Sequence, residues 1–182
     1  VHGDERVDNY HWLRDDERTD PDVLAYLTAE NEYTEAQLKD VEPLVDTLYR
    51  EITGRIKQND ESVPYQLDDY WYYRRYAEGQ EYPIYARKKG SLEADETVLL
   101  DINTLAKDYA YYASNYQKPS PNHKIYGFSE DTVSRRQYDL RFKDLETGKM
   151  LPDVIKNTTG SIAWAKDSKT FFYTRKHPVT LL

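Results

Sequence analysis

The spacing of apolar residues changes once along the chain, in the polar, turn-rich segment 59–64. Before this segment, apolar residues recur every three or four positions, which is the period of an amphipathic helix. After it, they alternate with polar residues, as in half-buried strands. The pattern therefore predicts a mainly β protein with an α-helical N-terminal arm, residues 1–64, followed by a β-domain, residues 65–182.

Two helices are predicted in the arm. Asp20 and Pro21 are typical of a helix start, because Asp caps free amides and Pro fits the first turn. We expect this helix to reach about Lys39, and a second helix to run from Pro43 to Lys57. Two amphipathic helices cover one another only in part, so their apolar stripes are expected to need a further partner. The stripes are Tyr26, Ala29, Tyr33 and Ala36 in the first helix, and Leu44, Leu48, Ile52 and Ile56 in the second.

A repeated motif organises the β-domain. Residues 121–126, PNHKIY, return in altered form as residues 166–172, KDSKTFF. Each time, a polar turn containing Asn or Asp leads to a Lys and then to an apolar strand. Lys124 and Lys169 are 45 residues apart (169 − 124), a period that fits propeller blades of roughly 40–50 residues.

Two more strands are predicted between the copies. Tyr138, Leu140 and Phe142 alternate with polar residues, so we expect them to face a neighbouring blade. Residues 146–149 predict a hairpin turn, in which Gly148 takes a positive φ. The strand that follows, residues 150–155, contains Pro152 and suits the outer edge of a blade. The repeating unit is therefore expected to hold four strands.

The same unit accounts for the rest of the β-domain. Strands are predicted at residues 70–76, 84–88 and 97–101 of one blade, at 109–115 as the innermost strand of the next, and at 161–165 and 170–175 of a third. The fold class is thus a partial β-propeller of about two and a half four-stranded blades. Because each blade buries its faces against two neighbours, we expect the chain to be a piece of a longer polypeptide.

Composition narrows the function classes. A net charge of −8 argues against nucleic-acid partners; it is explained by solubility, with weak attraction of cationic peptides as the alternative. No apolar run approaches the about 20 residues of a membrane span, so no membrane partner is expected. The absence of Cys suits a reducing compartment, and we expect a cytoplasmic protein.

The search for catalytic chemistry finds no site. The segment 127–131, GFSED, lacks the second Gly of a nucleophile elbow, and no phosphate-binding glycine loop is present. His2, His11, His123 and His177 lack metal-ligand spacing. Ser134, Arg135 and Arg136 could bind an anion or a partner, although a solvated loop explains them more simply. We therefore predict no catalytic residue, no metal ligand and no cofactor, and leave the substrate-binding residues open.

Three segments resemble the prolyl oligopeptidase family of serine peptidases, and its oligopeptidase B (protease II) branch in particular. They are VHGD with DNYHWLRD in residues 1–15, SRRQY with FKDLETG in residues 134–148, and RKHPVTLL in residues 175–182. The resemblance implies a seven-bladed propeller that caps a C-terminal α/β-hydrolase domain and restricts access to it. It places the Ser, Asp and His triad in that domain, so this chain alone is expected to be inactive. It also implies that short basic peptides are substrates, cut after Arg or Lys, and that the arm packs on the hydrolase domain.

Two other classes remain open from the residues alone. A stand-alone propeller could serve as a binding scaffold without catalysis, although such a scaffold needs no helical docking arm. A glycan-processing propeller would need two carboxyl groups held roughly 5–9.5 Å apart in a pocket, and no pair stands out in the sequence. Because propellers carry many functions, the fold by itself does not choose among these classes.

Overall fold

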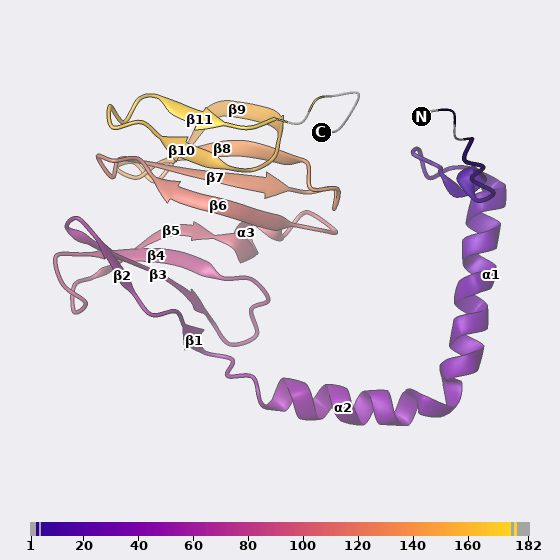
Figure 1. The fold of residues 1–182 in the computed structure, drawn as a ribbon. Helices are drawn as coiled ribbons and strands as arrows, with labels where there is room; N and C mark the ends of the chain where they lie inside the picture. The colour runs from indigo at the N-terminus through magenta and orange to yellow at the C-terminus, as the bar shows by residue number, and fades with distance from the viewer. Residues whose placement is uncertain (1–2, 4, 176, 178–182) are drawn as a thin grey trace. The chain divides into compact units, whose positions relative to one another are not determined.

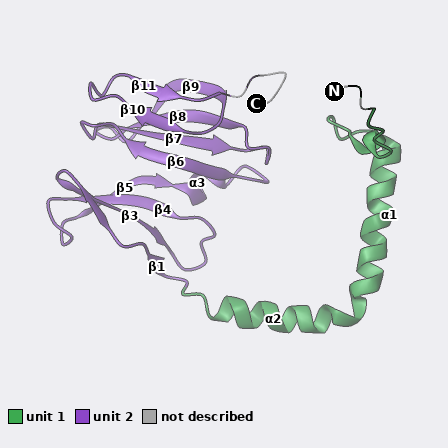
Figure 2. Ribbon diagram, in the orientation of Figure 1, with its two compact units in different colours: residues 1–57 green, residues 58–182 purple. Residues whose placement is uncertain are grey.

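The computed structural model describes residues 3, 5–175 and 177. The outer parts of two resembling segments, at Val1, His2 and Asp4 and at Lys176 and residues 178–182, lie outside the described residues. The chain forms two compact units, residues 1–57 and residues 58–182 (Figure 2). The first is helical and the second is built from sheets.

The helical unit follows the predicted pattern. Helix α1 spans Pro21–Leu38, and the Asp20 carboxylate accepts bonds from the amides of Asp22 and Val23. Helix α2 spans Glu42–Gly54 and ends before Lys57. A short 3-10 helix, His11–Leu13, precedes them, and Trp12 packs edge-on against Tyr26 with ring centroids 5.3 Å apart. Both helices are confirmed, with α2 shorter than predicted.

The predicted stripes of both helices are exposed within this unit. Leu44, Leu48, Ile52 and Ile56 are 46–59% exposed, and Val23 is the buried residue of α1. Complete burial of a fully exposed side chain of this size is worth about 1.5–3 kcal/mol, and these side chains have about half of that gain left to make. The packing of this face on a hydrolase domain stays a prediction.

The first sheet begins earlier than the sequence predicted. Its strands are β1 (Asp60–Glu61), β2 (Tyr65–Leu67), β3 (Tyr70–Tyr76), β4 (Ile84–Lys89) and β5 (Glu96–Asp101). β1 and β2 both pair with β3, so together they form one interrupted edge strand (Figure 1). Ser62 continues the pairing across the gap, because its amide donates to the Arg74 carbonyl at 2.8 Å. The segment read as a turn-rich boundary therefore contributes a strand.

The second sheet is four-stranded and antiparallel, in the order β6 (Ala113–Pro119), β7 (Ile125–Asp131), β8 (Tyr138–Asp144) and β9 (Met150–Thr158). The prediction of a strand over residues 109–115 is partly wrong, since β6 starts at Ala113. A helix α3 (Ile102–Ala106) and a turn come first, and Tyr112 is buried there, donating its hydroxyl to Glu130 at 2.7 Å. Gly148 has a φ of 72° in the predicted hairpin, and β9 forms the sheet edge that Pro152 suggested.

The 45-residue repeat is confirmed in the backbone. The amide of Ser120 donates to the Ile125 carbonyl at 2.7 Å, and the amide of Ala165 donates to the Thr170 carbonyl at 2.9 Å. His123 and Ser168 hold the same left-handed position, with φ values of 58° and 59°. The second copy leads into a third sheet of two described strands, β10 (Ile162–Trp164) and β11 (Phe171–Tyr173).

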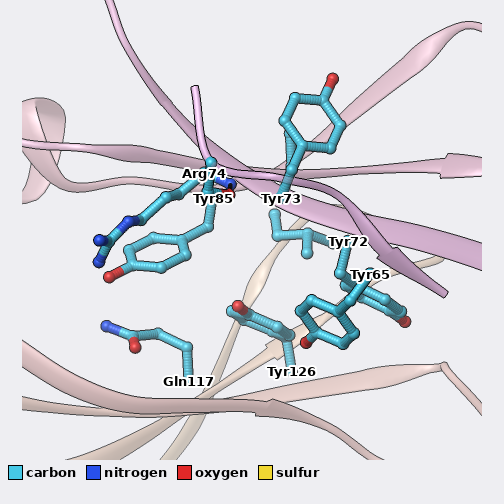
Figure 3. Close-up of a pocket in the computed structure, with 10 residues that line it drawn as sticks. Tyr65, Tyr72, Tyr73, Arg74, Tyr85, Gln117 and Tyr126 are labelled. Atoms are coloured by element: carbon cyan, nitrogen blue, oxygen red, sulfur yellow. Dashed lines mark hydrogen bonds between the residues drawn. The ribbon is translucent and has the colours of Figure 1, made fainter. Parts of the chain in front are cut away.

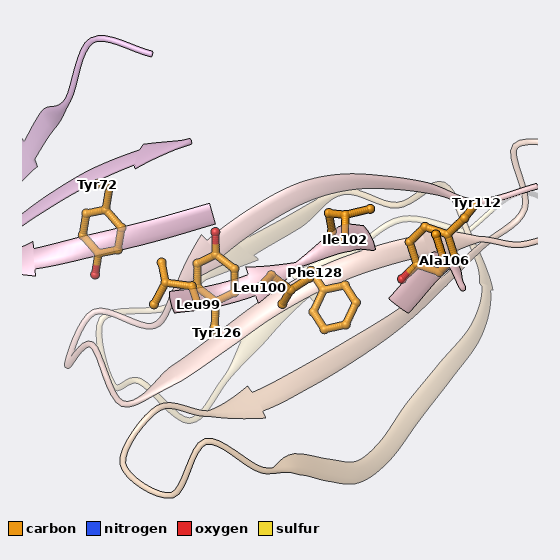
Figure 4. Packing of buried hydrophobic residues seen from close by; sticks show 8 residues of the cluster. All are labelled: Tyr72, Leu99, Leu100, Ile102, Ala106, Tyr112, Tyr126 and Phe128. Carbon is orange, nitrogen blue, oxygen red and sulfur yellow. The ribbon is translucent and has the colours of Figure 1, made fainter. Parts of the chain in front are cut away.

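Two cores lie between successive sheets. The first interface, between the first and second sheets, holds a buried cluster (Figure 4): Tyr72, Leu99, Leu100, Ile102, Ala106, Tyr112, Tyr126 and Phe128. The second interface, between the second and third sheets, is centred on Leu140, Phe142 and Ile162. The predicted phase of β8 is confirmed, since Leu140 and Phe142 are buried and Lys143 is half-buried on the opposite face. The sheets form an open array, and the blade count stays a prediction.

Candidate functional site

A cavity of about 130 Å³ lies between the first two sheets (Figure 3). Five tyrosines line it, together with Arg74, Leu99 and Gln117; the tyrosines are Tyr65, Tyr72, Tyr73, Tyr85 and Tyr126. Tyr72 and Arg74 on β3 and Tyr85 on β4 meet there because they share the face of the first sheet that points toward the second, and Arg74 and Tyr85 are directly opposite one another in the strand register. Tyr73 lies on the opposite face of β3, where its hydroxyl donates to Glu96 at 2.6 Å. The aromatic-rich strand at residues 70–76 thus becomes one wall of a hollow.

Tyr126 is, together with Tyr72, one of the two most buried tyrosines of this cavity. Its side chain is 3% exposed, and the hydroxyl points into the space near Tyr85 and Gln117 (Figure 3). Burial raises the pKa of Tyr126 well above its usual value, and the nearby phenols of Tyr65 and Tyr85 raise it further. Among the described residues, no group makes a hydrogen bond to this hydroxyl, so it stays a neutral donor open to a ligand.

The cavity lies where the edge strands of both sheets are irregular. The gap between β1 and β2, residues 62–64, places Ser62 in the cavity wall. On the other side, the β6–β7 pairing shifts register between Asn115 and Lys118, where Tyr116 has a φ of 51°. Gln117 lies inside this bulge and lines the cavity. Such irregularities interrupt the ladder within each sheet and change the direction of the side chains that follow.

A hydrogen-bonded chain adjoins the cavity. Asp68 Oδ2 lies 2.8 Å from His123 Nε2, and His123 Nδ1 lies 2.7 Å from the Tyr72 hydroxyl. A carboxylate only accepts, so in the neutral ring Nε2 carries the proton and Tyr72 donates to Nδ1. Arg87 Nη1 donates to the Tyr72 oxygen at 3.4 Å and to the His123 carbonyl at 3.0 Å. The chain joins β3 and β4 of the first sheet to the β6–β7 turn of the second.

Arg87 is an uncommon member of this chain, because it is a guanidinium only 6% exposed. It lies 4.1 Å from the centroid of the Tyr70 ring, a cation–π contact. No ion pair joins it to a carboxylate of the described residues, and its Nε has no hydrogen-bond partner there. Its nearest acid along the chain of bonds is Asp68, on the far side of His123.

Sequence reasoning missed this cluster. His123 was set aside for lack of ligand spacing, yet its partners lie 55 and 51 residues away. The available signal was the repeat itself, since His123 occupies the left-handed turn position that Ser168 occupies in the next copy. The clustering of Asp, Tyr and Arg around that position becomes visible only when the two sheets are packed together.

The other residues that the sequence suggested as candidates have structural roles. Ser129, from the segment lacking a complete elbow, is fully buried and donates its hydroxyl to the Asn115 carbonyl at 2.7 Å. The loop with Ser134 and Arg136 is held by the Asp131 carboxylate, which accepts from the amide of Arg136 at 2.8 Å. Across the described ranges, no cluster of three His or acidic residues suits a metal ion. In the same ranges, no helix combines the length and apolarity needed to cross a membrane.

Comparison with known proteins identifies the family. A family model described as the prolyl oligopeptidase N-terminal β-propeller domain matches residues 1–181. The chain belongs to the prolyl oligopeptidase family. The resemblance drawn from the three sequence segments is thereby confirmed, and the open sheets belong to a propeller domain of this family.

Relatives in this family agree over nearly the whole chain. Dipeptidyl aminopeptidase BI of Pseudoxanthomonas mexicana is 43% identical, over 100% of this chain and 27% of the relative. Protease 2 of Moraxella lacunata is 32% identical, over 96% of this chain and 26% of the relative. The structure of oligopeptidase B from Leishmania major matches with a TM-score of 0.87 and 34% identity, over 94% of this chain and 25% of that one. The chain thus spans about a quarter of the length of these prolyl oligopeptidase relatives.

Proposed function

We propose that this chain is the N-terminal, non-catalytic part of a serine oligopeptidase that hydrolyses short peptides. The family match over residues 1–181, in a chain about a quarter as long as its relatives, carries the proposal. In this reading the reactive Ser, the His that activates it and the orienting Asp belong to a C-terminal α/β-hydrolase domain of the same polypeptide. Acyl transfer then takes place there, and no residue of this chain performs a chemical step.

The role proposed for the sheets is to restrict access to the catalytic site. Supporting this, successive sheets pack face to face through buried cores, so they form a wall rather than a hinged flap. A folded protein cannot pass such a wall, whereas a short extended peptide can reach an enclosed site. The helical unit is proposed to pack on the hydrolase domain through the exposed stripe of α2, including Leu44 and Leu48.

Cleavage after Arg or Lys is the proposed specificity. It is supported by the likeness to proteins named protease 2 and oligopeptidase B. A second specificity, release of dipeptides from a free N-terminus, is favoured by the 43% identity with a dipeptidyl aminopeptidase. The two differ in whether the substrate must present a free amine.

The test uses the full-length parent protein. A fluorophosphonate probe is expected to label it, and residues 1–182 produced alone should remain unlabelled. Peptides with a blocked N-terminus and an internal Arg or Lys should be cut, while a folded protein with the same sequence in a surface loop should be spared. Labelling of residues 1–182 would contradict the absence of catalytic groups. Cleavage of free but not blocked peptides would select the dipeptidyl activity, and equal cleavage of folded and short substrates would overturn the gating role.

A further inference from the structure

Four polar groups of the cavity between the first two sheets can serve one ligand. Arg74 and Tyr85 come from β3 and β4, and Gln117 and Tyr126 come from β6 and β7 (Figure 3). Their guanidinium, phenol and amide groups can all donate hydrogen bonds. The site is therefore assembled from both sheets and exists only where they are packed together.

The charge of this site has one sign. None of the described residues that line the cavity is acidic, and Arg74 carries the one charge among them. Arg87 adds positive charge behind the wall, because it donates to the hydroxyl of Tyr72 and it acts to lower the pKa of Tyr126. A positive field combined with several donors favours a ligand that is anionic and accepts hydrogen bonds.

The hydroxyl of Tyr126, a residue only 3% exposed, points to the same conclusion. The Tyr126 hydroxyl can donate one hydrogen bond, and a ligand in the cavity can accept it. The group aims into the cavity and makes no bond to the described residues. An acceptor placed between Tyr126 and Arg74 would satisfy this donor and bring a counter-charge to a region that lacks one.

The size of the cavity limits what fits. One water molecule needs about 10–15 Å³ of such volume, so a cavity of about 130 Å³ holds more than a single water. A carboxylate with one or two carbon atoms fits. The gap at Ser62 and the bulge at Gln117 set the opening at the edge of the two sheets, so a group on a peptide chain can insert its end.

We propose that the tyrosine-lined cavity between the first two sheets is a binding site for a carboxylate group, held by Arg74, Tyr85, Gln117 and Tyr126. The bound carboxylate belongs to a peptide, either as its C-terminus or as an Asp or Glu side chain. This identification of the ligand as a peptide rests on the proposed peptidase function. The binding of a simple carboxylate does not depend on that function. The site holds a peptide near the edge strands of the sheets. It contributes to substrate binding and takes no part in the chemical step.

The first test measures a small anion against a neutral molecule of the same shape. Fluorine NMR of trifluoroacetate and of trifluoroacetamide is recorded with the full-length protein, whose active site is first blocked by a fluorophosphonate. Saturable broadening is expected for trifluoroacetate, with at least about fivefold weaker binding of trifluoroacetamide, because bonds to charged groups are the stronger ones. Equal binding of the two molecules, or binding of neither, would overturn the proposal.

Matched variants locate the binding. Tyr126→Phe and Arg74→Gln should each weaken trifluoroacetate binding by at least about fivefold, the effect of losing one bond to a charged group. Tyr111→Phe removes a phenol hydroxyl and Lys149→Gln removes a positive charge, both at exposed positions outside the cavity, and both should leave binding unchanged. If Tyr126→Phe fails to fold, Arg74→Gln still decides, since Arg74 is exposed at the rim. Unchanged binding in Arg74→Gln would refute the assignment.

Peptide competition then separates the two sources. A short peptide with a free C-terminus, its amidated form, and an amidated form with an added internal Glu are tested for displacement of trifluoroacetate. Displacement by the free acid alone identifies the C-terminal carboxylate, and displacement by the Glu peptide as well identifies a general acidic site. If no peptide displaces trifluoroacetate, the site still binds an anion, but the claim that the carboxylate comes from a peptide is wrong. If the full-length protein shows no peptidase activity in separate assays, the proposed function is wrong and the result for anion binding still holds.

Discussion

The two interfaces between sheets are held by different chemistry. At the second interface, the rings of Phe142, Trp164 and Phe171 pack edge-on or tilted, with centroids 4.9–6.1 Å apart, beside Leu140 and Ile162. The first interface contains a larger apolar cluster, and beside it lie the hydrogen-bonded chain Asp68–His123–Tyr72–Arg87 and a cavity. An apolar interface depends on volume and tolerates small shifts of its members. A bonded interface depends on direction, because each donor must meet its acceptor.

This difference indicates where each interface is sensitive. Removing volume should damage the second interface most, and removing single polar atoms should damage the first. Local stability in the full-length protein can be followed by hydrogen exchange of individual strands, which reports opening of each region separately. Four changes test this contrast.

Removal of the Phe142 ring should have the largest effect. Phe142→Ala leaves a cavity at the centre of the second interface, and a loss of about 3–5 kcal/mol is expected. Hydrogen exchange of β8 and β10 should accelerate, while that of β4 stays near its original rate. Acceleration confined to the first sheet would show that the phase of β8 has been misjudged.

A single methyl group at Gly160 should be nearly as damaging. Gly160 joins β9 to β10 at a φ of +93°, and an added Cβ would lie 3.0 Å from atoms of Ser129 and Tyr138. Overpacking costs about 1–3 kcal/mol, and the left-handed backbone adds about 1–2 kcal/mol. Gly90→Ala is the control, since its φ is +80° and nothing lies within 4 Å. Equal thermal destabilisation by both substitutions would rule out the close approach at Gly160.

Removal of one oxygen at the first interface should have a moderate effect. Tyr72→Phe deletes the donor to His123 and the acceptor for Arg87, and it leaves the ring volume in place. A buried group that loses its partner costs about 1–3 kcal/mol. Urea-dependent exchange of β3 measures this, with Tyr111→Phe as an exposed control close to zero change. A neutral result for Tyr72→Phe would mean that the first interface is also held by volume alone.

The smallest effect is expected at Lys143, which links the two interfaces from the other face of β8. Its ammonium donates to the Leu99 carbonyl at 2.8 Å, and burial lowers its pKa. The unfolded chain keeps the proton up to about pH 10.4, so between the lowered folded pKa and that value it binds more protons than the folded chain. Lys143 therefore makes stability rise with pH in this window.

The check on Lys143 is a comparison of the wild-type protein with Lys143→Met at several alkaline pH values. The raised pKa values of Tyr72 and Tyr126 act in the opposite direction above about pH 10 in both proteins, so the difference between the two proteins isolates Lys143. The stability advantage of wild type over the variant should grow by less than about 1 kcal/mol. A shrinking advantage would contradict the lowered pKa.

Short-range patterns in the sequence alone determined several helices, strands and turns of this fold. The cap at Asp20 and Pro21, the alternation through Tyr138, Leu140 and Phe142, and the turn at Gly148 each involve residues within a few positions of one another. Their physical causes, a capped amide, a two-residue side-chain period and a permissive backbone, act over that same short range. The 45-residue repeat and the family resemblance extended this reading to the propeller fold and the proposed peptidase.

Tertiary structure decided what depends on pairing between distant residues. β1 is two residues long and carries no strand pattern, so it is defined by β3 alone. The start of β6 was displaced because burial of Tyr112 against Glu130 holds the preceding turn outside the sheet. The cavity, and the meeting of Asp68 with His123 across 55 positions, follow from the stacking of two sheets. The number of possible pairings between distant residues is large, and only the packed core selects among them.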